Sequence, residues 1–249
     1  MSAPSQRRRG VVTGAGGGIG KALVHRLLRE GVDVLAVDVN RSGLADLEGV
    51  SCKALAGDLT ESAVRARVAD WAEGADYLVN AAGIIMIKPI FDLTVEDWRR
   101  VQTINAEATF FLCQKIGPRL NPGGAIVNLS SSSAKLATTI EVAAYAASKT
   151  TILSITRSFA YALASRPVRV NAILPGIVDT PMQEEVLEKV APMRGLTPDA
   201  WRGARNKAVP LGRGSSPEEC AALIWFLLSE ESAYMTGQAI NFTGGLVTW

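Results

Sequence analysis

A tyrosine and a lysine four residues apart form a pair that could move a proton. Tyr145 and Lys149 lie in a segment of helical composition, which would place both side chains on one face of a helix, one turn apart. An unperturbed tyrosine has a pKa of about 10, so a tyrosine base near neutral pH needs about 3 to 4 kcal/mol of stabilisation for its charged form. One cation about 4 Å away supplies about that much at an effective dielectric constant of about 20. The pair therefore has the chemistry of a general base and its activating cation.

A run of four serines offers this pair a hydroxyl partner. Residues 130–133 follow the apolar run Ala125–Leu129, so they would stand where a strand ends. A hydroxyl there can bind the oxygen of a substrate as that oxygen becomes a carbonyl or an alkoxide. One serine of the run is predicted to do so, and the others are expected to be ordinary loop residues.

A glycine-rich turn near the start of the chain has the chemistry of phosphate binding. The segment Thr13-Gly14-Ala15-Gly16-Gly17-Gly18-Ile19-Gly20 follows a short apolar run and opens a helical pattern. Glycine lets the backbone turn sharply and approach a diphosphate, and the free N–H groups of a helix N-terminus face the anion. The turn therefore predicts a dinucleotide-binding site.

An acidic residue at the end of the second apolar run bears on which dinucleotide binds. The carboxylate of Asp38 could accept hydrogen bonds from both hydroxyls of the adenosine ribose, and it would repel a 2′-phosphate. No lysine or arginine stands in the glycine turn itself, so NAD is predicted rather than NADP. Arg41 lies close enough in sequence to favour NADP instead, and Asp38 could simply cap the turn that follows it.

Short runs of Val, Ile, Leu and Ala alternate with segments of helical period along the chain. Such alternation is typical of a parallel sheet with helices on both faces, and runs that are apolar throughout indicate strands buried on both sides. The predicted helices are Ile19–Arg29, Glu61–Glu73, Val95–Leu120 and Val142–Ser165, and the run Ala221–Leu228 is read as the buried face of another. The predicted strands are Gly10–Thr13, Asp33–Asp38, Ser51–Ala56, Tyr77–Asn80, Ala125–Leu129, Val168–Ile173 and Gln238–Asn241.

The composition describes an ordinary globular chain. Its 249 residues carry a formal charge of +2 and are 48% hydrophobic and 20% charged, which excludes a disordered chain and leaves no basic surface for nucleic acid. Cys52, Cys113 and Cys220 stand apart with a single histidine, His25, so neither a disulfide framework nor a metal site is predicted. Arg7–Arg9 is expected to be a solvated tail. No secretory signal or membrane-spanning run is found, which predicts a cytoplasmic protein without a membrane partner.

Residues 177–213 break the alternation of strands and helices. They hold no strand pattern, only short helical pieces that Pro181, Pro192, Pro198 and Pro210 are expected to break. An insertion this long in a compact domain is typical of a lid over a ligand site, although a surface excursion without a role would show the same pattern.

Taken together, the motifs are identified as those of the short-chain dehydrogenase/reductase family. The glycine turn has the spacing T-G-x-x-x-G-I-G, which differs from the commoner dinucleotide fingerprint in the gap between its glycines. Further blocks follow in the family's order along nearly the whole chain: Asp58-Leu59, Asn80-Ala81-Ala82-Gly83, Asn105, Ser130–Ser133, Tyr145 with Lys149, and Pro175-Gly176 followed by Thr180.

This resemblance implies a single doubly wound Rossmann domain over residues 1–249, an α/β fold with helices on both faces of a seven-stranded parallel sheet in the order 3-2-1-4-5-6-7. The cofactor would cross the carboxyl ends of the strands. Asp58 would receive the adenine amino group, and Val178 and Thr180 would hold the nicotinamide carboxamide. The implied cofactor-binding residues are Gly14, Gly18, Ile19, Asp38, Asp58, Leu59, Asn80, Ala81, Gly83, Tyr145, Lys149, Val178 and Thr180.

The implied catalytic residues are Asn105, Ser131, Tyr145 and Lys149. The family's serine falls on Ser131 when counted from the preceding strand and on Ser132 when counted back from Tyr145. We select Ser131, because the strand fixes depth in the sheet while the loop after it can absorb one extra residue. Tyr145, as phenolate, would remove the hydroxyl proton of a secondary alcohol while a hydride passes to NAD. The backbone of Asn105 would hold a water that links Lys149 to solvent.

Substrate and assembly follow only from the resemblance. The pattern is most like members that oxidise small polyols, sugars or deoxy-sugar acids. Members that act on dihydrodiols or 3-oxoacyl thioesters are alternatives, and so is a regulator that senses NAD without chemistry. An arginine of the lid could bind a carboxylate. Because the family's tetramers pack their last strand and tail against a neighbour, a homotetramer is expected, with Trp249 at the interface or in a neighbour's substrate site.

Overall fold

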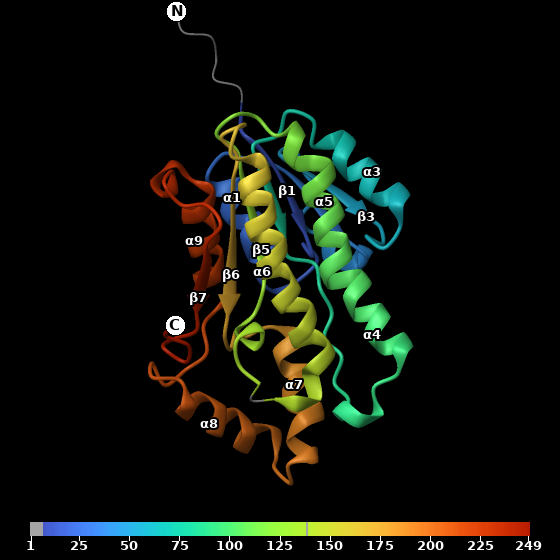
Figure 1. Cartoon of the computed structure of the whole chain (residues 1–249), viewed down its shortest axis with the longest axis vertical. Helices are drawn as coiled ribbons and strands as arrows, with labels where there is room; N and C mark the ends of the chain where they lie inside the picture. The colour runs from blue at the N-terminus through green and yellow to red at the C-terminus, as the bar shows by residue number, and fades with distance from the viewer. Residues whose placement is uncertain (1–6, 138) are drawn as a thin grey trace, which may run out of the picture.

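Seven parallel strands form one sheet in the order β3-β2-β1-β4-β5-β6-β7 in the computed structural model, which describes residues 7–137 and 139–249 (Figure 1). The number and order of the strands confirm the prediction. β1 pairs with β2 on one side and with β4 on the other. Strands up to β3 are therefore added on one side of β1 and later strands on the other, and this switch leaves a crevice at the carboxyl ends of the strands. The strands are β1 (Arg9–Thr13), β2 (Asp33–Asp38), β3 (Cys52–Ala56), β4 (Tyr77–Asn80), β5 (Ala125–Leu129), β6 (Arg169–Pro175) and β7 (Ala239–Phe242).

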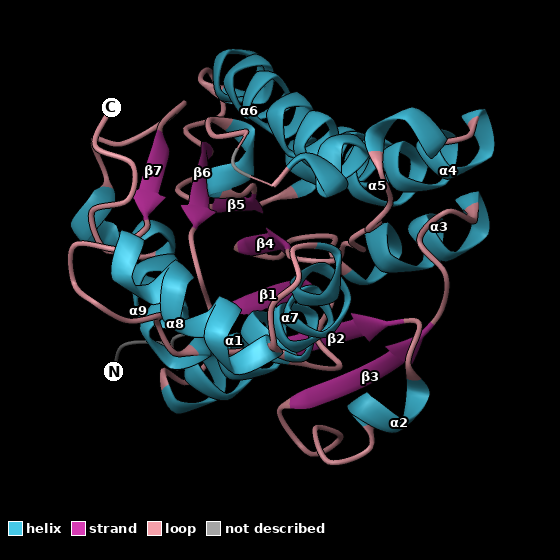
Figure 2. Cartoon of the chain, turned by 90° about the horizontal axis from the view of Figure 1, so that it is seen from below, coloured by secondary structure: helices cyan, strands magenta, loops and turns pink. Residues whose placement is uncertain are grey.

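Helices cover both faces of this sheet (Figure 2). One face carries α1 (Gly18–Arg29), which packs along α9 (Pro217–Leu228). The other face carries α3 (Ser62–Trp71), α5 (Ala108–Ile116) and α6 (Ala143–Leu163). A short helix that was not predicted, α2 (Arg41–Leu44), lies beside β2 and β3. Single 3-10 turns lie at Ile90–Asp92, Gly117–Arg119, Ser132–Ala134, Ile140–Val142 and Glu230–Ser232.

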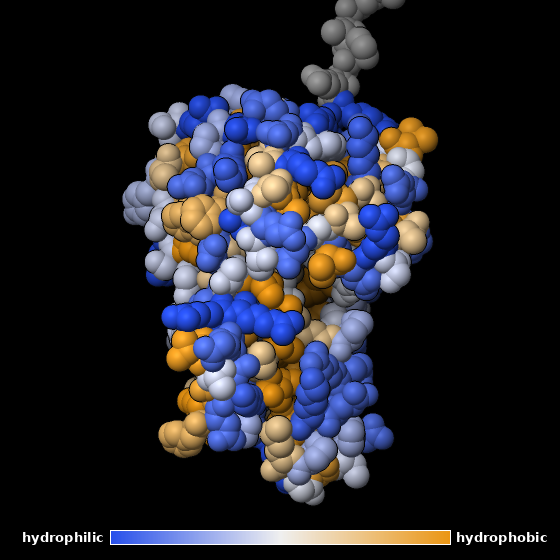
Figure 3. Space-filling model, turned by 90° about the vertical axis from the view of Figure 1, so that its right-hand side faces the viewer, coloured by the Kyte–Doolittle hydropathy of each residue, from blue (hydrophilic) through white to orange (hydrophobic). Residues whose placement is uncertain are grey.

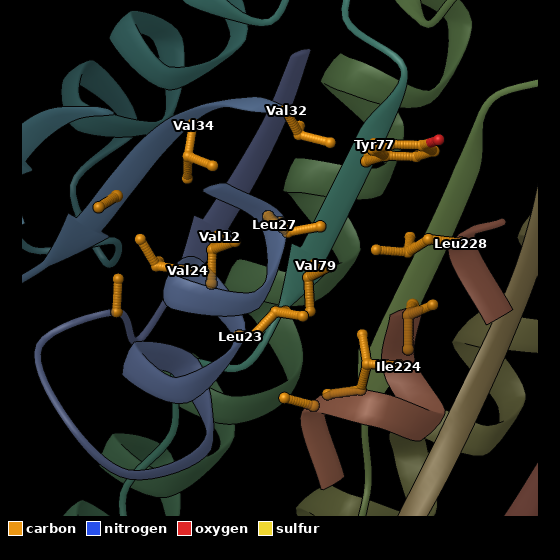
Figure 4. Packing of buried hydrophobic residues seen from close by; sticks show 14 of the residues in the cluster. Val12, Leu23, Val24, Leu27, Val32, Val34, Tyr77, Val79, Ile224 and Leu228 are labelled. Carbon is orange, nitrogen blue, oxygen red and sulfur yellow. The ribbon is translucent and has the colours of Figure 1, made fainter. Parts of the chain in front are cut away.

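Successive residues of a strand contribute to two different hydrophobic clusters. Val12 belongs to the cluster beneath α1 and α9, where Leu23 and Ile224 are fully buried (Figure 4). Its neighbour Val11 belongs to the cluster beneath α3, α5 and α6. Burying one such aliphatic side chain contributes about 1.5 to 3 kcal/mol, so the two clusters together hold both helical layers on the sheet.

The helix predicted over Val95–Leu120 is not α-helical throughout. Helix α4 (Val95–Gln102) passes into a π-helical turn, Thr103–Glu107, before α5 begins. The backbone N–H that follows this turn bonds to a carbonyl five residues back rather than four, so the turn accommodates an extra residue. Asn105 lies in the turn and is fully buried. The segment is thus helical from 95 to 119, as predicted, but its geometry changes at a proposed site residue.

Residues 177–213, which we call the lid, contain two helices that lie beyond the carboxyl ends of the strands (Figure 1). These are α7 (Pro181–Met193) and α8 (Pro198–Ala208), and each follows a threonine N-cap. Proline suits the first helical turn, because its missing N–H would have no partner there. Pro181 and Pro198 were predicted to break helices. That prediction was wrong, because each of them is the first residue of a helix.

The arginines near the start of the chain bind the body of the protein. Arg8 donates to the hydroxyl of Tyr77 at 2.8 Å and pairs with Glu230 at 2.6 Å. Arg9 donates to main-chain carbonyls at the end of α3. Because β1 begins at Arg9, the segment is held too close to the sheet to fray, and the expected solvated tail was wrong for Arg7–Arg9. Residues 1–6 of the predicted tail lie outside the described residues.

The cysteines and acidic groups form no clusters in the described part of the chain. Cys52, Cys113 and Cys220 are buried and free. Over residues 7–137 and 139–249, no three His, Cys, Asp or Glu side chains gather as metal ligands would. In the same residues no helix combines the length and the apolar character needed to cross a membrane.

Candidate active site

A cavity of about 530 Å³ lies at the carboxyl ends of the strands, between the sheet and the lid. Figure 3 shows the surface hollowed, with hydrophobic residues inside, where the broad body of the molecule meets its narrower lower part. Its volume is typical of a small-molecule or cofactor site. The predicted site residues that line it are Gly14, Gly18, Ile19, Asp38, Asp58, Leu59, Ala81, Gly83, Ser131, Tyr145, Lys149, Val178 and Thr180.

The glycine turn is pressed against the turn that follows β4. Gly14 has a φ of +66°, and a Cβ on it would lie 2.7 Å from the backbone nitrogen of Ala82. Thr13 ties the two turns together, since its hydroxyl accepts hydrogen bonds from the N–H groups of Ala81 and Ala82 at 3.1 Å. Sequence reasoning missed this role of Thr13, although a hydroxyl residue directly before the glycines was a signal for it.

Asp38 both lines the cavity and caps the turn after β2. One carboxylate oxygen accepts from the N–H of Gly16 and the other from the N–H of Asn40, each at 2.8 Å. The capping role and the ribose-binding role are compatible, because a carboxylate has about four acceptor sites. Arg41, which could have favoured NADP, starts α2 with an exposed side chain and does not line the cavity.

Tyr145 and Lys149 lie one turn apart on α6, as the spacing predicts, and both are buried. The ammonium of Lys149 lies 5.6 Å from the centre of the Tyr145 ring and donates to the carbonyl of Leu129 at 2.7 Å. The hydroxyl of Ser130 donates to the carbonyl of Lys149 at 2.7 Å, so two contacts join α6 to the end of β5. Ser131 lines the same cavity, and its side chain acts to lower the pKa of Tyr145.

The electrostatics of this pair differ from the expectation. Burial raises the pKa of Tyr145 above its ordinary value, and the hydrogen bond from Ser131 offsets part of that rise. Burial also lowers the pKa of Lys149 to about 8, so the ammonium still predominates at pH 7 but is lost at a lower pH than that of an exposed lysine. Desolvation therefore acts against both charged forms, and the predicted activation of Tyr145 by Lys149 has to overcome it.

Two predicted site residues lie behind the cavity rather than on its surface. Asn80 is buried between strands, where its amide donates to the side-chain oxygen of Asn128 at 2.8 Å. Asn105 uses its side-chain amide to hold both the N–H and the carbonyl of Ile84, at 2.8 and 2.9 Å. A Cβ on Gly83 would lie 3.2 Å from Asn105 Oδ1 and 3.4 Å from the Lys149 ammonium. Asn105 and Lys149 therefore converge on the same point beside Gly83.

The lid meets the glycine turn across the cavity. Thr180 caps α7, and its methyl group would lie 3.2 Å from a Cβ on Gly18. Val178 forms a single bridge with Ser215, so the start of the lid is held by the chain beyond its end. Two cations also line the cavity, Arg100 on α4 and Arg205 on α8. Sequence reasoning did not distinguish them from the other arginines of the chain.

The carboxyl-terminal residue folds back toward the serine loop. The main-chain oxygen of Trp249 accepts from Lys135 at 2.6 Å and from Asn241 at 3.0 Å, and the Lys135 ammonium lies 5.6 Å from the indole. The indole itself is 70% exposed. The chain therefore positions this ring at the surface, and its contact with a second subunit stays a prediction.

Known proteins resemble this chain along nearly its full length. The family profile described as enoyl-(acyl carrier protein) reductase matches residues 14–247. The chain is 35% identical to a 3-oxoacyl-[acyl-carrier-protein] reductase of Thermotoga maritima, covering 95% of this chain and 96% of that one. It is 34% identical to galactitol 2-dehydrogenase of Agrobacterium fabrum, with coverages of 94% and 95%.

The fold resembles solved structures to the same extent. A short chain dehydrogenase family protein of Francisella tularensis superposes with a TM-score of 0.89 at 32% identity, covering 97% of this chain and 99% of that one. The sheet order, the motifs in their order and these matches agree. The chain therefore belongs to the short-chain dehydrogenase/reductase family of oxidoreductases.

Proposed function

We propose that this protein interconverts a secondary alcohol and a ketone on a small hydroxylated substrate, with NAD as the hydride acceptor. The observation that carries the proposal is the convergence of Ser131, Tyr145 and Lys149 in one cavity at the carboxyl ends of the strands. A hydroxyl partner, a proton-transfer group and a cation are the parts that alcohol oxidation requires of the protein.

The cavity fits a dinucleotide where a side chain would obstruct it. A Cβ on Gly14 would strike the backbone after β4, so only glycine lets the two turns pack together there, whereas a Cβ on Gly17, which also lines the cavity, would meet no protein atom within 4 Å. NAD, when bound, supplies the atom that receives the hydride. The residues that would hold it are Gly14, Gly18, Ile19, Asp38, Asp58, Leu59, Ala81, Gly83, Tyr145, Lys149, Val178 and Thr180, with Asn80 supporting the turn from behind.

Tyr145 is the group that would take the substrate's proton. As a phenolate it accepts the hydroxyl proton while Ser131 binds the same substrate oxygen. Ser131 acts against the effect of burial on the Tyr145 pKa. The Lys149 ammonium, 5.6 Å from the ring centre, would also favour the phenolate by its charge. The proton then leaves through Lys149 toward Asn105, whose side chain lies at the same point beside Gly83. Reduction follows the same path in reverse.

Asp38 supports a preference for NAD over NADP. Its carboxylate stands at the end of β2 in the wall of the cavity, where a 2′-phosphate would meet a negative charge. Val39, which follows it and also lines the cavity, offers no positive charge in exchange. Arg41 is exposed and does not line this wall.

Small polyols, sugars or sugar acids are the proposed substrates. The likeness to galactitol 2-dehydrogenase supports this class. A 3-oxoacyl thioester is the second candidate, because the relative from Thermotoga maritima is named for that substrate and shows similar identity. Turnover of a polyol panel against a panel of 3-oxoacyl thioesters separates the two.

Replacing Tyr145 by Phe tests the reaction itself. We expect Tyr145→Phe to lower kcat by at least about 1,000-fold with the best alcohol of a polyol, sugar and sugar-acid panel, because the proton acceptor is lost. NADH formation measures turnover, and calorimetry measures NAD binding, which should change by less than about threefold since the ring remains. Tyr161→Phe is the matched control, an exposed tyrosine on the same helix. Binding of NAD with no turnover of any alcohol or thioester by the natural chain would favour a sensor instead.

We also propose that the chain assembles as a homotetramer. Large apolar side chains are exposed on α4, α5 and α6, among them Trp98, Phe110 and Tyr161. Exposed apolar groups that lie on neighbouring helices are typical of surfaces that subunits cover. Light scattering during size-exclusion chromatography tests this, and a monomeric mass at micromolar concentration would contradict it.

A further inference from the structure

The charges that line the cavity are separated by sign. Of the two acidic residues that line it, Asp38 ends β2 and Asp58 follows β3. The three cations that line it, Arg100, Lys149 and Arg205, come from α4, α6 and α8. Among the described lining residues these helices contribute no carboxylate. The part of the lining that they form, which includes Tyr145, therefore carries positive charge only.

Most cations of the lid have an acidic partner. Arg194 pairs with Glu141 at 3.1 Å. Two further pairs lie outside the cavity, with distances of 2.6 Å each: Arg202 with Glu184 and Lys189 with Glu185. In each pair the opposite charges neutralise each other, so these residues add little net charge to the lid.

Arg205 has no such partner among the residues that the structure describes. It lines the cavity, and its Nη1 atom is excluded from solvent without a hydrogen bond. Burial lowers the pKa of Arg205, and the nearby positive charge of Arg194 lowers it further. The C-terminal turn of α8, in which Arg205 lies, contributes only a partial negative charge. Arg205 as a residue is only partly buried, but a guanidinium N–H group that is shut off from water without an acceptor is costly, which favours an anion from outside the chain as its partner.

We infer that Arg205 binds a carboxylate of the substrate, so that the preferred substrates are hydroxy acids such as aldonates rather than neutral polyols. The inference rests on the proposed function, because it assigns the substrate class of the same site. An arginine suits a carboxylate, since its planar fork can donate two parallel hydrogen bonds. The exposed guanidinium of Arg100, in the same part of the lining, adds to the attraction without being buried.

Binding in the absence of turnover gives the direct test. Tyr145→Phe loaded with NAD is titrated calorimetrically with threonate, xylonate, gluconate and galactonate, and with the polyol of equal chain length in each case. We expect the best aldonate to bind at least about tenfold more tightly than its polyol, as a charge-assisted bidentate contact predicts. Aldonates that bind no more tightly than their polyols would overturn the inference.

Variants of α8 then show whether Arg205 is responsible. Arg205→Met, in the same background, should remove the tenfold preference and leave polyol binding within about threefold, and Arg205→Lys should keep part of it. Lys207→Met is the control, since it removes one charge from an exposed position on the same helix. If Lys207→Met removes the aldonate preference to the same extent, the preference arises from the overall charge of the lid. That result would overturn the assignment to Arg205.

The affinity for NAD separates the substrate role from a cofactor role. If Arg205→Met weakens NAD binding as much as aldonate binding, the guanidinium serves the cofactor's phosphates and the inference fails. These titrations need no chemistry, so they are independent of the test of the reaction. Aldonate binding that depends on Arg205, in a natural chain that oxidises no alcohol, would sustain this inference while contradicting the proposed function.

Discussion

At the scale of single residues, Lys149 carries a charge into one of the least exposed parts of the site. Only 4% of its surface is accessible, and its ammonium donates to the carbonyl of Leu129. The neutral and the charged forms can both make that hydrogen bond, but only the charged form loses hydration on burial. Holding the charged form of Lys149 beside Tyr145 therefore lowers the folding stability.

This cost predicts how stability depends on pH. Burial lowers the pKa of Lys149 from 10.5 to about 8, so between these values the unfolded chain binds more protons and stability rises with pH. The shift corresponds to about 3 kcal/mol. We expect the free energy of unfolding of the natural chain, relative to Lys149→Met, to rise by about 2 to 3 kcal/mol from pH 7 to pH 10, as measured by urea denaturation. The bond to Leu129 is lost at every pH and cancels, so a difference that does not change with pH would contradict this account.

The serine loop gives a second prediction at this scale. The side chain of Ser131 acts to lower the pKa of Tyr145, whereas Ser132 begins a 3-10 turn. We expect Ser131→Ala to lower kcat by about 100- to 1,000-fold, as the loss of one oxyanion donor does elsewhere, and Ser132→Ala to lower it by less than about threefold. Steady-state kinetics of both variants on one alcohol decide this. The reverse order would move the role to Ser132.

At the scale of elements, β2 and the glycine turn act together. The carboxylate that ends β2 accepts the N–H of Gly16 in the turn, so the position of Asp38 depends on both elements. The amide oxygen of Asp38→Asn can still accept that hydrogen bond but carries no charge, and the second bond, from the N–H of Asn40, is lost. We expect this variant to raise the kcat/KM with NADP relative to NAD by about 10- to 100-fold, since repulsion of the 2′-phosphate is removed.

Arg41, which follows β2 in the sequence, supplies the control. Arg41→Gln removes a charge that does not line the cavity, so the ratio of kcat/KM for the two cofactors should stay within about threefold. A large fall in NADP use by this variant would show that Arg41 reaches the 2′-phosphate. An unchanged ratio in Asp38→Asn would leave the preference without its proposed cause.

At the scale of the whole molecule, the sheet and the lid differ in how firmly they are held. Strands β1, β4 and β5 are almost wholly buried, whereas α8 has no buried residue. The lid is attached through the bridge of Val178 to Ser215, through α7 and through surface ion pairs. Such an element belongs to the low-stability end of a fold.

Hydrogen exchange should show this difference. We expect amides of residues 198–208 to exchange at least about 100-fold faster than those of the central strands. Adding NAD together with a bound alcohol or aldonate should slow exchange in residues 181–208 more than elsewhere, because the ligand fills the cavity beneath them. Equal protection of the sheet and the lid would contradict a lid function.

The sequence by itself determined the strands, most helices and the Tyr145–Lys149 pair. Apolar runs, helical period and spacing of four are local properties, and local backbone geometry turns them into elements directly. The motif order further specified the sheet and placed Ser131 ahead of Ser132. The π-turn at Asn105 left no such signal, since one extra residue in a helix does not disturb its composition.

Only the tertiary structure decided which distant side chains meet and which remain unpaired. It placed Asn80 behind the cavity, buried Lys149 deeply enough to lower its pKa, and separated Arg205 from the paired cations of the lid. None of these follows from spacing along the chain. Burial and pairing depend on segments far apart in sequence, and the energy of a charge depends on its surroundings in space.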